Sequence, residues 1–385
     1  MNFSLSSDQQ AFQRAARDFA DAELTPLAAE WDANAHFPVD VLHNAGKQGF
    51  LGIYTPDAQG GLGLLRLDAS IIFEQLARGC TSTTAYITIH NMVAWMIASF
   101  AEESVKQEYA CQLAEGELLS SYCLTEPEAG SDAASLKTRA TLKHDDYILN
   151  GSKAFISGAG STQILLVMAR TGEQGPGGIS AFLVPANLRG INYGRKEEKL
   201  GWNSQPTRAI TFDNVTIPKR FLLGKEGDGF RFAMAGLDGG RVNIASCSVG
   251  TAQQALTATR DYMMERKQFG KTLSAFQALQ FKLADMETEL VAARQMVRLA
   301  ANKLDCKHPC ATTYCAMAKR FATDVGFNIC DQALQLHGGY GYIKEYPFER
   351  YLRDTRVHRI LEGSNEIMRL IVARRLFSEE RPELL

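Results

Sequence analysis

The stretch YILNGSKAFIS, at residues 147–157, decides the fold class because it is a short run rich in β-forming residues, which is typical of a half-buried β-strand. Similar short runs, separated by Gly and Pro, occupy the zone from about residue 121 to 226: TRATLKH, QILLVMAR, ISAFLVP and RAITFDNVTIP. Asn150-Gly151 inside the stretch predicts a hairpin, because a type I′ turn needs a positive φ at both central residues. The zone therefore predicts a small antiparallel β-barrel or sandwich.

Helical patterns lie on both sides of this β zone. On the N-terminal side, apolar residues such as Phe12 and Phe19 fall at helical spacing, and further helices are predicted at 68–78, 82–100 and 103–114. On the C-terminal side, helical patterns at 229–265, 274–305, 309–336 and 365–378 predict an up-and-down four-helix bundle. We therefore expect a mainly α protein with a small central β domain, divided into domains 1–120, 121–226 and 227–385.

Composition excludes several partners. A net charge of −2 gives no electrostatic reason to expect nucleic acid or an anionic membrane surface. Apolar runs are too short to span a bilayer. The N-terminal residues have neither an apolar signal core nor an acid-poor transit pattern. A cytoplasmic, bacterial protein is the simplest interpretation.

The 8 cysteines form no CxxC pair, and we interpret them as reduced thiols. Cys306, Cys310 and Cys315 lie near His308, but their spacing matches no zinc template. We predict no metal site.

Three distant segments carry the functional signal. Glu362 lies in RDTRVHRILEGSNEIMR, and Gly363 directly after it leaves the backbone approachable at the break between helix and loop. Alone, such a Glu would be interpreted as a solvated surface residue. Together with YCLTEPEAGSD at 122–132 and LQLHGGYGY at 334–342, the segment resembles the acyl-CoA dehydrogenase family along nearly the whole chain. That family has the same order of helical, β and helical domains.

The resemblance implies an FAD cofactor. Thr125 would bond the flavin edge, Gly130 and Ser131 would meet the pyrophosphate, Phe155 would stack on the ring, and Ser157 would bond near N5. KAFIS replaces the Trp-Ile-Thr of most members, and Glu128 replaces a smaller residue. The same strands would add Tyr122, Leu124 and Ile156, and the segment after Glu362 would add Ser364 and Glu366.

Two further segments resemble those that reach the flavin of a neighbouring subunit. ERKQFGKTLSAFQALQ, at 265–280, offers a guanidinium for pyrophosphate and apolar rings for adenine. The residues implied are Arg266, Phe269, Phe276, Gln277, Gln335, Gly338 and Gly339. The resemblance therefore implies a homo-oligomer, with a tetramer as the family habit.

The family reaction removes a proton alpha to a thioester and a hydride from the beta carbon. Glu362 aligns with the base, whose pKa desolvation would raise toward working pH. Some members carry the base on the first helix of the C-terminal domain, where this chain has Gly240. The implied substrate contacts are Ser131, Asp238, Arg241, Gly363 and Arg374.

The segments GWNSQPTRA, LDGGRVNIASCS and RVHRILEGSNE look most like the branch that converts isobutyryl-CoA to methacryloyl-CoA in valine breakdown. Short straight-chain or 2-methylbutyryl thioesters are the alternatives, since one methylene discriminates by only about 1–3 kcal/mol. Electrons would pass to an electron-transferring flavoprotein. An acyl-CoA oxidase, a non-catalytic scaffold and a DNA-associated relative are the other classes considered; the acidic balance opposes the last.

Overall fold

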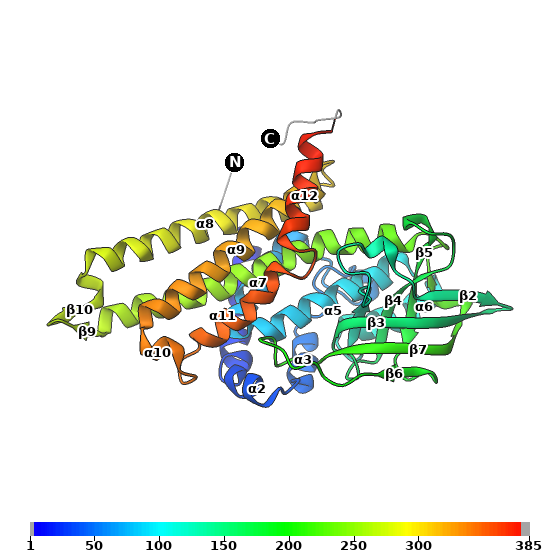
Figure 1. Cartoon of the computed structure of the whole chain (residues 1–385), viewed down its shortest axis with the longest axis horizontal. Helices are drawn as coiled ribbons and strands as arrows, with labels where there is room; N and C mark the ends of the chain where they lie inside the picture. Colours follow the sequence, from blue (N-terminus) through cyan, green and yellow to red (C-terminus); the bar gives the residue numbers. More distant parts are fainter. Residues whose placement is uncertain (1–3, 379–385) are drawn as a thin grey trace.

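The computed structural model describes residues 4–378. Helices occupy both ends of the chain, and one β-sheet lies between them in the sequence and at one end of the molecule in space (Figure 1). The predicted order of helical, β and helical parts is confirmed.

The N-terminal helices begin with a strong cap. Ser6 accepts a hydrogen bond from the backbone of Gln9, whose side chain accepts one from Ser6 N, so the first turn has reciprocal partners. Helix α5 is buried on almost every side and forms the centre of this domain. The elements are α1 (Ser7–Phe19), the π-helix η1 (Ala20–Leu24), α2 (Ala28–Asn34), α3 (Val39–Lys47), α4 (Arg66–Gly79), α5 (Thr81–Phe100) and α6 (Glu103–Ala114).

The β domain is one sheet with the strand order β6-β7-β3-β2-β4-β5-β8, and β1 pairs with β4. Most neighbours are antiparallel as predicted, but β1 runs parallel to β4, and β2 also meets β4 in parallel. The strands are β1 (Ser120–Cys123), β2 (Arg139–Lys143), β3 (Asp146–Ser157), β4 (Ile164–Arg170), β5 (Ile179–Pro185), β6 (Ile191–Tyr193), β7 (Thr207–Pro218) and β8 (Leu222–Leu223).

The predicted hairpin at Asn150-Gly151 is wrong. Strand β3 runs through this pair, and the β2–β3 turn lies at His144, where φ is +58°. Gly151 has φ +144° and marks a bulge against β7, while Asn150 accepts a hydrogen bond from Asn214 N across the sheet. Because β3 pairs with β7 on both sides of Gly151, the positive φ of Gly151 forms a bulge instead of a hairpin turn.

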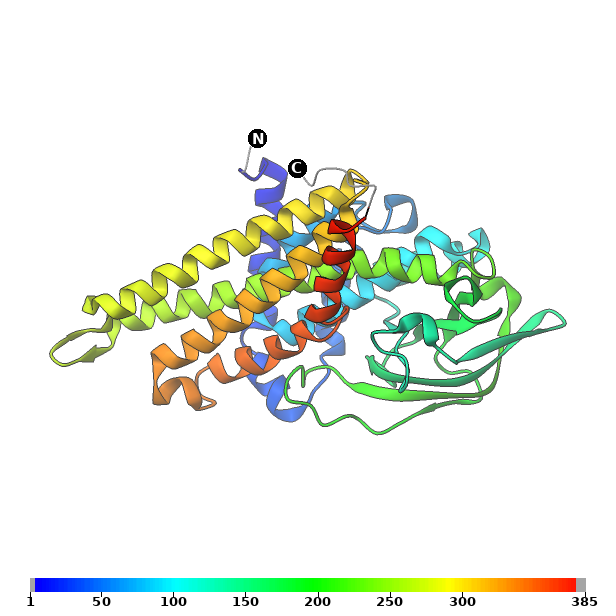
Figure 2. The same cartoon turned by 45° about the horizontal axis from the view of Figure 1, so that its top comes forward.

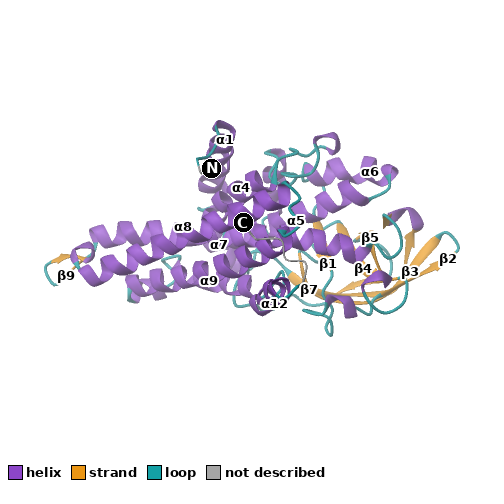
Figure 3. Ribbon diagram, turned by 90° about the horizontal axis from the view of Figure 1, so that it is seen from above, coloured by secondary structure: helices purple, strands orange, loops and turns teal. Residues whose placement is uncertain are grey.

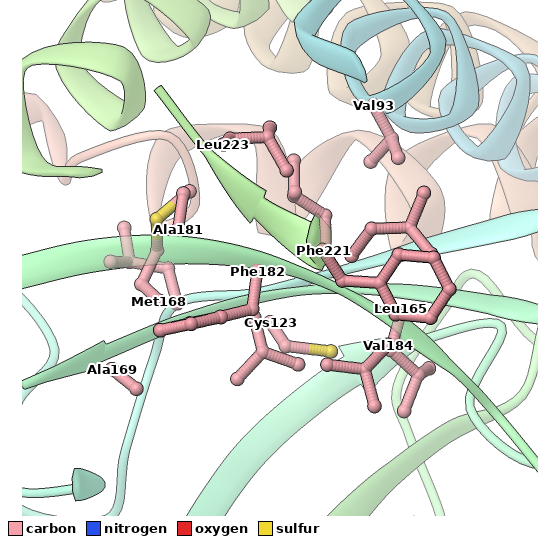
Figure 4. Close-up of a cluster of buried hydrophobic side chains, with 14 of the residues drawn as sticks. Val93, Cys123, Leu165, Met168, Ala169, Ala181, Phe182, Val184, Phe221 and Leu223 are labelled. Atoms are coloured by element: carbon pink, nitrogen blue, oxygen red, sulfur yellow. The ribbon is translucent and has the colours of Figure 1, made fainter. Parts of the chain in front are cut away.

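The inner face of the sheet packs against helix α5. Figure 4 shows Phe182, Leu165 and Val184 of the sheet close to Phe221, with Val93 of α5 above them. All five are buried. This shared core ties β1, and the loop that follows it, to the helical part of the molecule.

Helices α7 (Gly229–Glu265), α8 (Gln277–Asp305) and α9 (Ala311–His337) form a long bundle, which Figure 2 shows running away from the sheet. Strands β9 (Lys267–Gln268) and β10 (Lys271–Thr272) make a hairpin at its far end. Helix α4 packs on both α7 and α8, so an N-terminal helix joins the bundle.

The last helices differ from the predicted bundle. Helix α11 (Phe348–Arg356), which the periodicity did not predict, packs along α9 and α7, whereas α12 (Asn365–Leu376) packs on α9 but runs across it (Figures 1 and 3). The short elements are α10 (Gly339–Tyr342) and the 3-10 turns η2 (Asp57–Gln59), η3 (Ala133–Ser135), η4 (Pro176–Gly178), η5 (Lys219–Phe221), η6 (Leu273–Ala275) and η7 (Val357–Arg359). Glu362 lies in the link between η7 and α12.

Candidate active site

Glu362 is held in an uncommon backbone conformation. Its φ is +57°, and Gly363 follows with φ +83°, so the chain turns sharply before α12. Its Oε2 atom is buried and has no hydrogen-bond partner within residues 4–378. The turn thus places one carboxylate inside the protein with an oxygen free to act.

Helix α7 makes room for this carboxylate at Gly240. A Cβ at position 240 would lie 2.4 Å from Glu362 Oε2 and 2.8 Å from its Cδ. Real Cβ atoms do not approach other atoms so closely, so a side chain there would displace the carboxylate. The structure therefore brings together the two positions that the sequence compared as alternative locations of a base.

Two cations surround Glu362. Arg241 Nε donates to the carbonyl of Glu362 at 3.4 Å, and Lys319 Nζ donates to that of Gly363 at 2.8 Å. Burial raises the pKa of Glu362 to about 7, while Arg241 and Lys319 act to lower it. A carboxyl with this pKa is suited to take a proton near neutral pH.

Two tyrosines lie near the same carboxylate. Tyr122 has a buried hydroxyl without a partner within the described residues, and Tyr54 accepts a hydrogen bond from Asn243 at 3.2 Å. Burial raises the pKa of both phenols, and the Glu362 charge raises it further. Both hydroxyls therefore stay neutral and add no negative charge beside Glu362.

The residues predicted for the flavin ring lie on β3 and in the loop after β1. Ala154 N donates to the carbonyl of Thr125 at 2.9 Å, and Ser121 Oγ donates to that of Ser157 at 2.7 Å. Phe155 stands between them in β3 with φ +57° and 70% of its surface exposed. Thr125, Phe155 and Ser157 thus belong to one small region.

A buried ion pair supports this region. Lys153 Nζ lies 2.7 Å from Glu126 Oε1 and also donates to the Leu124 carbonyl at 3.0 Å. The Glu126 carboxylate accepts from the backbone of Lys137 and Thr138. Lys153 of β3 therefore holds the loop after β1 in place.

The region has the surface that a flavin requires. Such a ring needs a flat apolar neighbour and approachable backbone for its phosphates. Phe155 presents an exposed ring, and a Cβ at Gly130 would meet nothing within 4 Å. Ser131 beside it is exposed, whereas Leu124 and Ile156 are buried beneath the surface.

The second predicted group lies at the far end of the bundle. Arg266, Gln335, Gly338 and Gly339 line one cavity of about 540 Å³ there. Phe269 in the β9–β10 hairpin is 93% exposed, its ring 6.2 Å from that of Phe276, and Gln277 is exposed at the start of α8. Within one chain this group lies far from Glu362, since the β9–β10 hairpin and α12, which Glu362 precedes, are well separated along the bundle (Figure 1).

The remaining predicted residues differ in placement. Asp238 lies beside Arg241 with a 2.5 Å ion pair, and Ser364 caps α12 by accepting from Ile367 N. Glu366 and Arg374 are exposed on α12.

Sequence reasoning missed Lys319, Tyr54, Arg66 and Lys153. Lys319 shares one face of α9 with the buried residues Cys315, Ala322 and Thr323, at helical spacing. That spacing was the available signal for a buried lysine. Arg66, whose guanidinium lies 3.5 Å from the Tyr54 ring, gave no such pattern.

Family models for the acyl-CoA dehydrogenase N-terminal, middle and C-terminal domains match residues 6–117, 121–215 and 227–377. The chain belongs to the acyl-CoA dehydrogenase family.

Individual relatives support this placement. The chain is 53% identical over 378 residues to an isobutyryl-CoA dehydrogenase, mitochondrial, of Bos taurus, covering 98% of this chain and 91% of the relative. It is 54% identical over 377 residues to the protein of that name from Dictyostelium discoideum, with the same coverage.

Solved structures share the fold. Butyryl-CoA dehydrogenase from Megasphaera elsdenii has a TM-score of 0.95 at 37% identity and covers 98% of this chain and 100% of its own. An FAD complex of PigA has a TM-score of 0.94 at 28% identity, covering 98% and 99%. A chain from work on the electron transferring flavoprotein of Acidaminococcus fermentans has a TM-score of 0.96 at 40% identity, covering 98% and 100%.

Two other expectations concern metal binding and membranes. All eight cysteines are free, and no group of three His, Cys, Asp or Glu residues within 4–378 could hold a metal ion. In that range, no helix combines the length and apolar character needed to cross a membrane.

Proposed function

We propose that the protein catalyses FAD-dependent α,β-dehydrogenation of isobutyryl-CoA to methacryloyl-CoA, a step of valine breakdown. The observation that carries the proposal is the Glu362 carboxylate, buried against Gly240 with one oxygen unpartnered and its pKa raised to about 7. The similarity to isobutyryl-CoA dehydrogenases over nearly the whole chain supports the substrate.

Glu362 removes the proton from the carbon alpha to the thioester. Its desolvated carboxylate gains basicity from burial, and the turn at Gly363 fixes the direction of its approach. The neutral phenols of Tyr54 and Tyr122 add no competing negative charge near the developing enolate. When bound, FAD supplies the acceptor for the hydride that leaves the beta carbon.

Residues of β3 and of the loop after β1 would hold the flavin ring. Thr125 and Ser157 offer hydroxyls, Phe155 offers a ring face, and the backbone near Gly130 is open to phosphate. The FAD complex of PigA, with the same fold, supports this cofactor.

The assembly is proposed to be a homo-oligomer, with a tetramer expected. Gly240 and Glu265 are separated by 25 residues of α7 (265 − 240), about 38 Å at 1.5 Å per residue. The Arg266 group therefore lies farther from Glu362 of the same chain than an extended dinucleotide reaches. A second copy would bring its Arg266 group to the first copy's flavin.

The absence of side chains at Gly239 and Gly240 makes room on α7 for Arg66 and Glu362. The branched substrate is therefore proposed from the similarity to isobutyryl-CoA dehydrogenases. Short straight-chain and 2-methylbutyryl thioesters are the alternatives. The proposed electron acceptor is an electron-transferring flavoprotein, and an oxidase that uses oxygen is the competing class.

The substrate is tested by anaerobic flavin reduction with isobutyryl-, butyryl- and 2-methylbutyryl-CoA under matched conditions. We expect isobutyryl-CoA to give the highest kcat/KM, and 2-methylbutyryl-CoA, which has one more methylene, to react about 10–200-fold less efficiently. A higher kcat/KM for butyryl-CoA would refute the branched substrate while leaving the enzyme class intact. Rapid reoxidation of the reduced flavin by air would favour the oxidase.

A further inference from the structure

The turn that carries Glu362 needs support from outside itself. A non-glycine residue with positive φ is strained and persists only where neighbouring structure fixes it. Glu362 has φ +57°, and the next residue, Gly363, has φ +83°. The groups that hold these two residues therefore determine where the carboxylate lies.

Lys319 is one of these groups. Its side chain is fully buried on α9, and its Nζ donates to the Gly363 carbonyl at 2.8 Å and to Asn365 Oδ1 at 3.0 Å. Asn365, the first residue of α12, in turn donates to Asp324 Oδ1 at 2.9 Å. One ammonium group thus joins α9, the turn and the start of α12.

Arg241 holds the adjacent carbonyl from another helix. Its Nε donates to Glu362 O at 3.4 Å from α7, so two consecutive carbonyls receive donors from two cations. The Arg241 guanidinium has Asp238 as an ion-pair partner at 2.5 Å. Lys319 has no ion pair of comparable length among the residues described, and its charge is therefore available to Glu362.

We propose that Lys319 is a positioning residue for the base: it fastens the Gly363 carbonyl and places a positive charge behind the Glu362 carboxylate. The inference rests on the proposed role of Glu362. Lys319 does not touch the reacting carbon; it acts by holding the turn at Gly363.

The surrounding charges agree with this role. Burial lowers the pKa of Lys319 to about 7, against the opposing effects of Glu362, Asp324 and Glu366. His358, beside Lys319, stays neutral because burial and the Lys319 charge lower its pKa. Charged and titratable groups facing the pair from all packed elements are Tyr54, Arg66, Tyr122, Asp238, Arg241, Cys315, Asp324, His358, Arg359 and Glu366.

The direction in which Lys319 shifts the pKa of Glu362 follows from the positive charge of Lys319. Lys319 favours the ionised form of Glu362, so removing the ammonium should raise the pKa of Glu362 above about 7. Less base would then be available at neutral pH, and the rate would recover at higher pH. A lysine with a purely structural role would change the folded fraction without moving the pH profile.

The test compares Lys319→Met, Lys319→Arg and the parent by anaerobic flavin reduction with saturating isobutyryl-CoA, from about pH 6 to about pH 9, at matched flavin content. For Lys319→Met we expect the apparent pKa to rise by about one unit, which lowers the rate near neutral pH by roughly 3–10-fold. Lys319→Arg keeps a charge at all these pH values and should keep or lower the apparent pKa. The matched control is Lys199→Met, which removes a partly buried lysine bonded to the Gln205 carbonyl elsewhere.

Unfolding measurements give a second readout. The pKa of Lys319 is lowered in the folded state, so burying its charged ammonium lowers the free energy of unfolding by the full amount below about pH 7. This loss becomes smaller as the pH rises toward the unfolded pKa of about 10.4. The stability of the parent relative to Lys319→Met should therefore rise between about pH 7 and about pH 9. Equal pH dependence in parent and variant would mean that the pKa of Lys319 is not lowered in the fold.

An unchanged rate profile in Lys319→Met would overturn the inference. If that variant yields no folded flavoprotein, Lys319→Arg decides, and an alkaline shift in it would overturn the inference instead. If isobutyryl-CoA does not reduce the parent, the proposed substrate has failed, and the acyl-CoA that does reduce it is used for the same profiles.

Discussion

At the scale of single residues, the contact between Glu362 and Gly240 limits what α7 can carry. The two groups come from segments 122 positions apart in sequence (362 − 240), yet a Cβ on Gly240 would overlap the carboxylate at 2.4 Å. A base on α7 and a base at position 362 would compete for the same space. The structure thus gives a steric reason why only one of the two positions bears a carboxylate.

Gly240→Ala should move the base. We expect flavin reduction to slow by at least about tenfold, since a displacement near 1 Å can cost about 10²-fold, while flavin content stays the same. Gly239→Ala is the comparison, because its Cβ would meet only the movable end of Arg66 at 2.5 Å. Equal rates in both variants would mean that the Glu362 contact does not matter.

Glu362→Gln should change the pH dependence of stability. The pKa of Glu362 is raised to about 7 in the fold, so the parent loses stability as the pH rises from about 4.3 through about 7. The variant lacks this loss and should gain on the order of 2–3 kcal/mol relative to the parent between pH 5 and pH 8. Urea unfolding at the two pH values measures the difference, and its absence would contradict a buried ionised Glu362.

Glu362 was predicted through family resemblance, but its environment was not. Lys319 appears in the sequence as one cation in a helix, and Tyr54 as one residue of a loop. Their roles depend on α7, α9 and α12 meeting, which local periodicity does not encode. The raised pKa of Glu362 could be predicted as a direction because the reaction requires desolvation.

At the scale of elements, β3 shows how local and long-range preferences diverge. Asn150-Gly151 has the composition of a turn, but β7 pairs on both sides of it, and the pair becomes a bulge. The ranges of the long helices α4 to α9 were close to prediction because their periodicity extends over many residues. The direction of α12 was missed because it depends on packing against α9.

The ion pair between β3 and the loop after β1 should control cofactor binding. Lys153→Met leaves the Glu126 carboxylate buried and unpaired, so we expect a loss of about 3–5 kcal/mol in the free energy of unfolding and reduced flavin content. Lys137→Met is the control, because its pair with Glu128 is solvent-exposed and should change neither quantity measurably. Unchanged flavin content in Lys153→Met would show that the loop holds its form without the pair.

At the scale of the whole molecule, the two predicted cofactor groups lie at different ends of α7 (Figure 1). A flavin that contacts both must lie between two chains. Mixing two variant chains tests this arrangement, because each site would then be built from residues of two different chains.

Glu362→Gln and Arg266→Glu should each be inactive alone but active when refolded or expressed together. In a mixed dimer, one site receives Glu362 and Arg266 intact, so random pairing should restore about one quarter of the parental sites. Flavin reduction by isobutyryl-CoA measures the recovery. Mixtures no more active than the separate variants would place both groups at the flavin of a single chain.

The most direct measurement of the central claim, that Glu362 is the base, is anaerobic flavin reduction by isobutyryl-CoA in Glu362→Gln and the parent. Gln keeps the size of the side chain but cannot take the proton, so we expect the rate to fall by about 10⁴-fold or more at matched flavin content, with acyl-CoA binding little changed. Glu345→Gln, at an exposed position of the same C-terminal region, should react like the parent. A Glu362→Gln variant that reduces its flavin within about tenfold of the parental rate would contradict the claim, because general-base assistance is worth more than that.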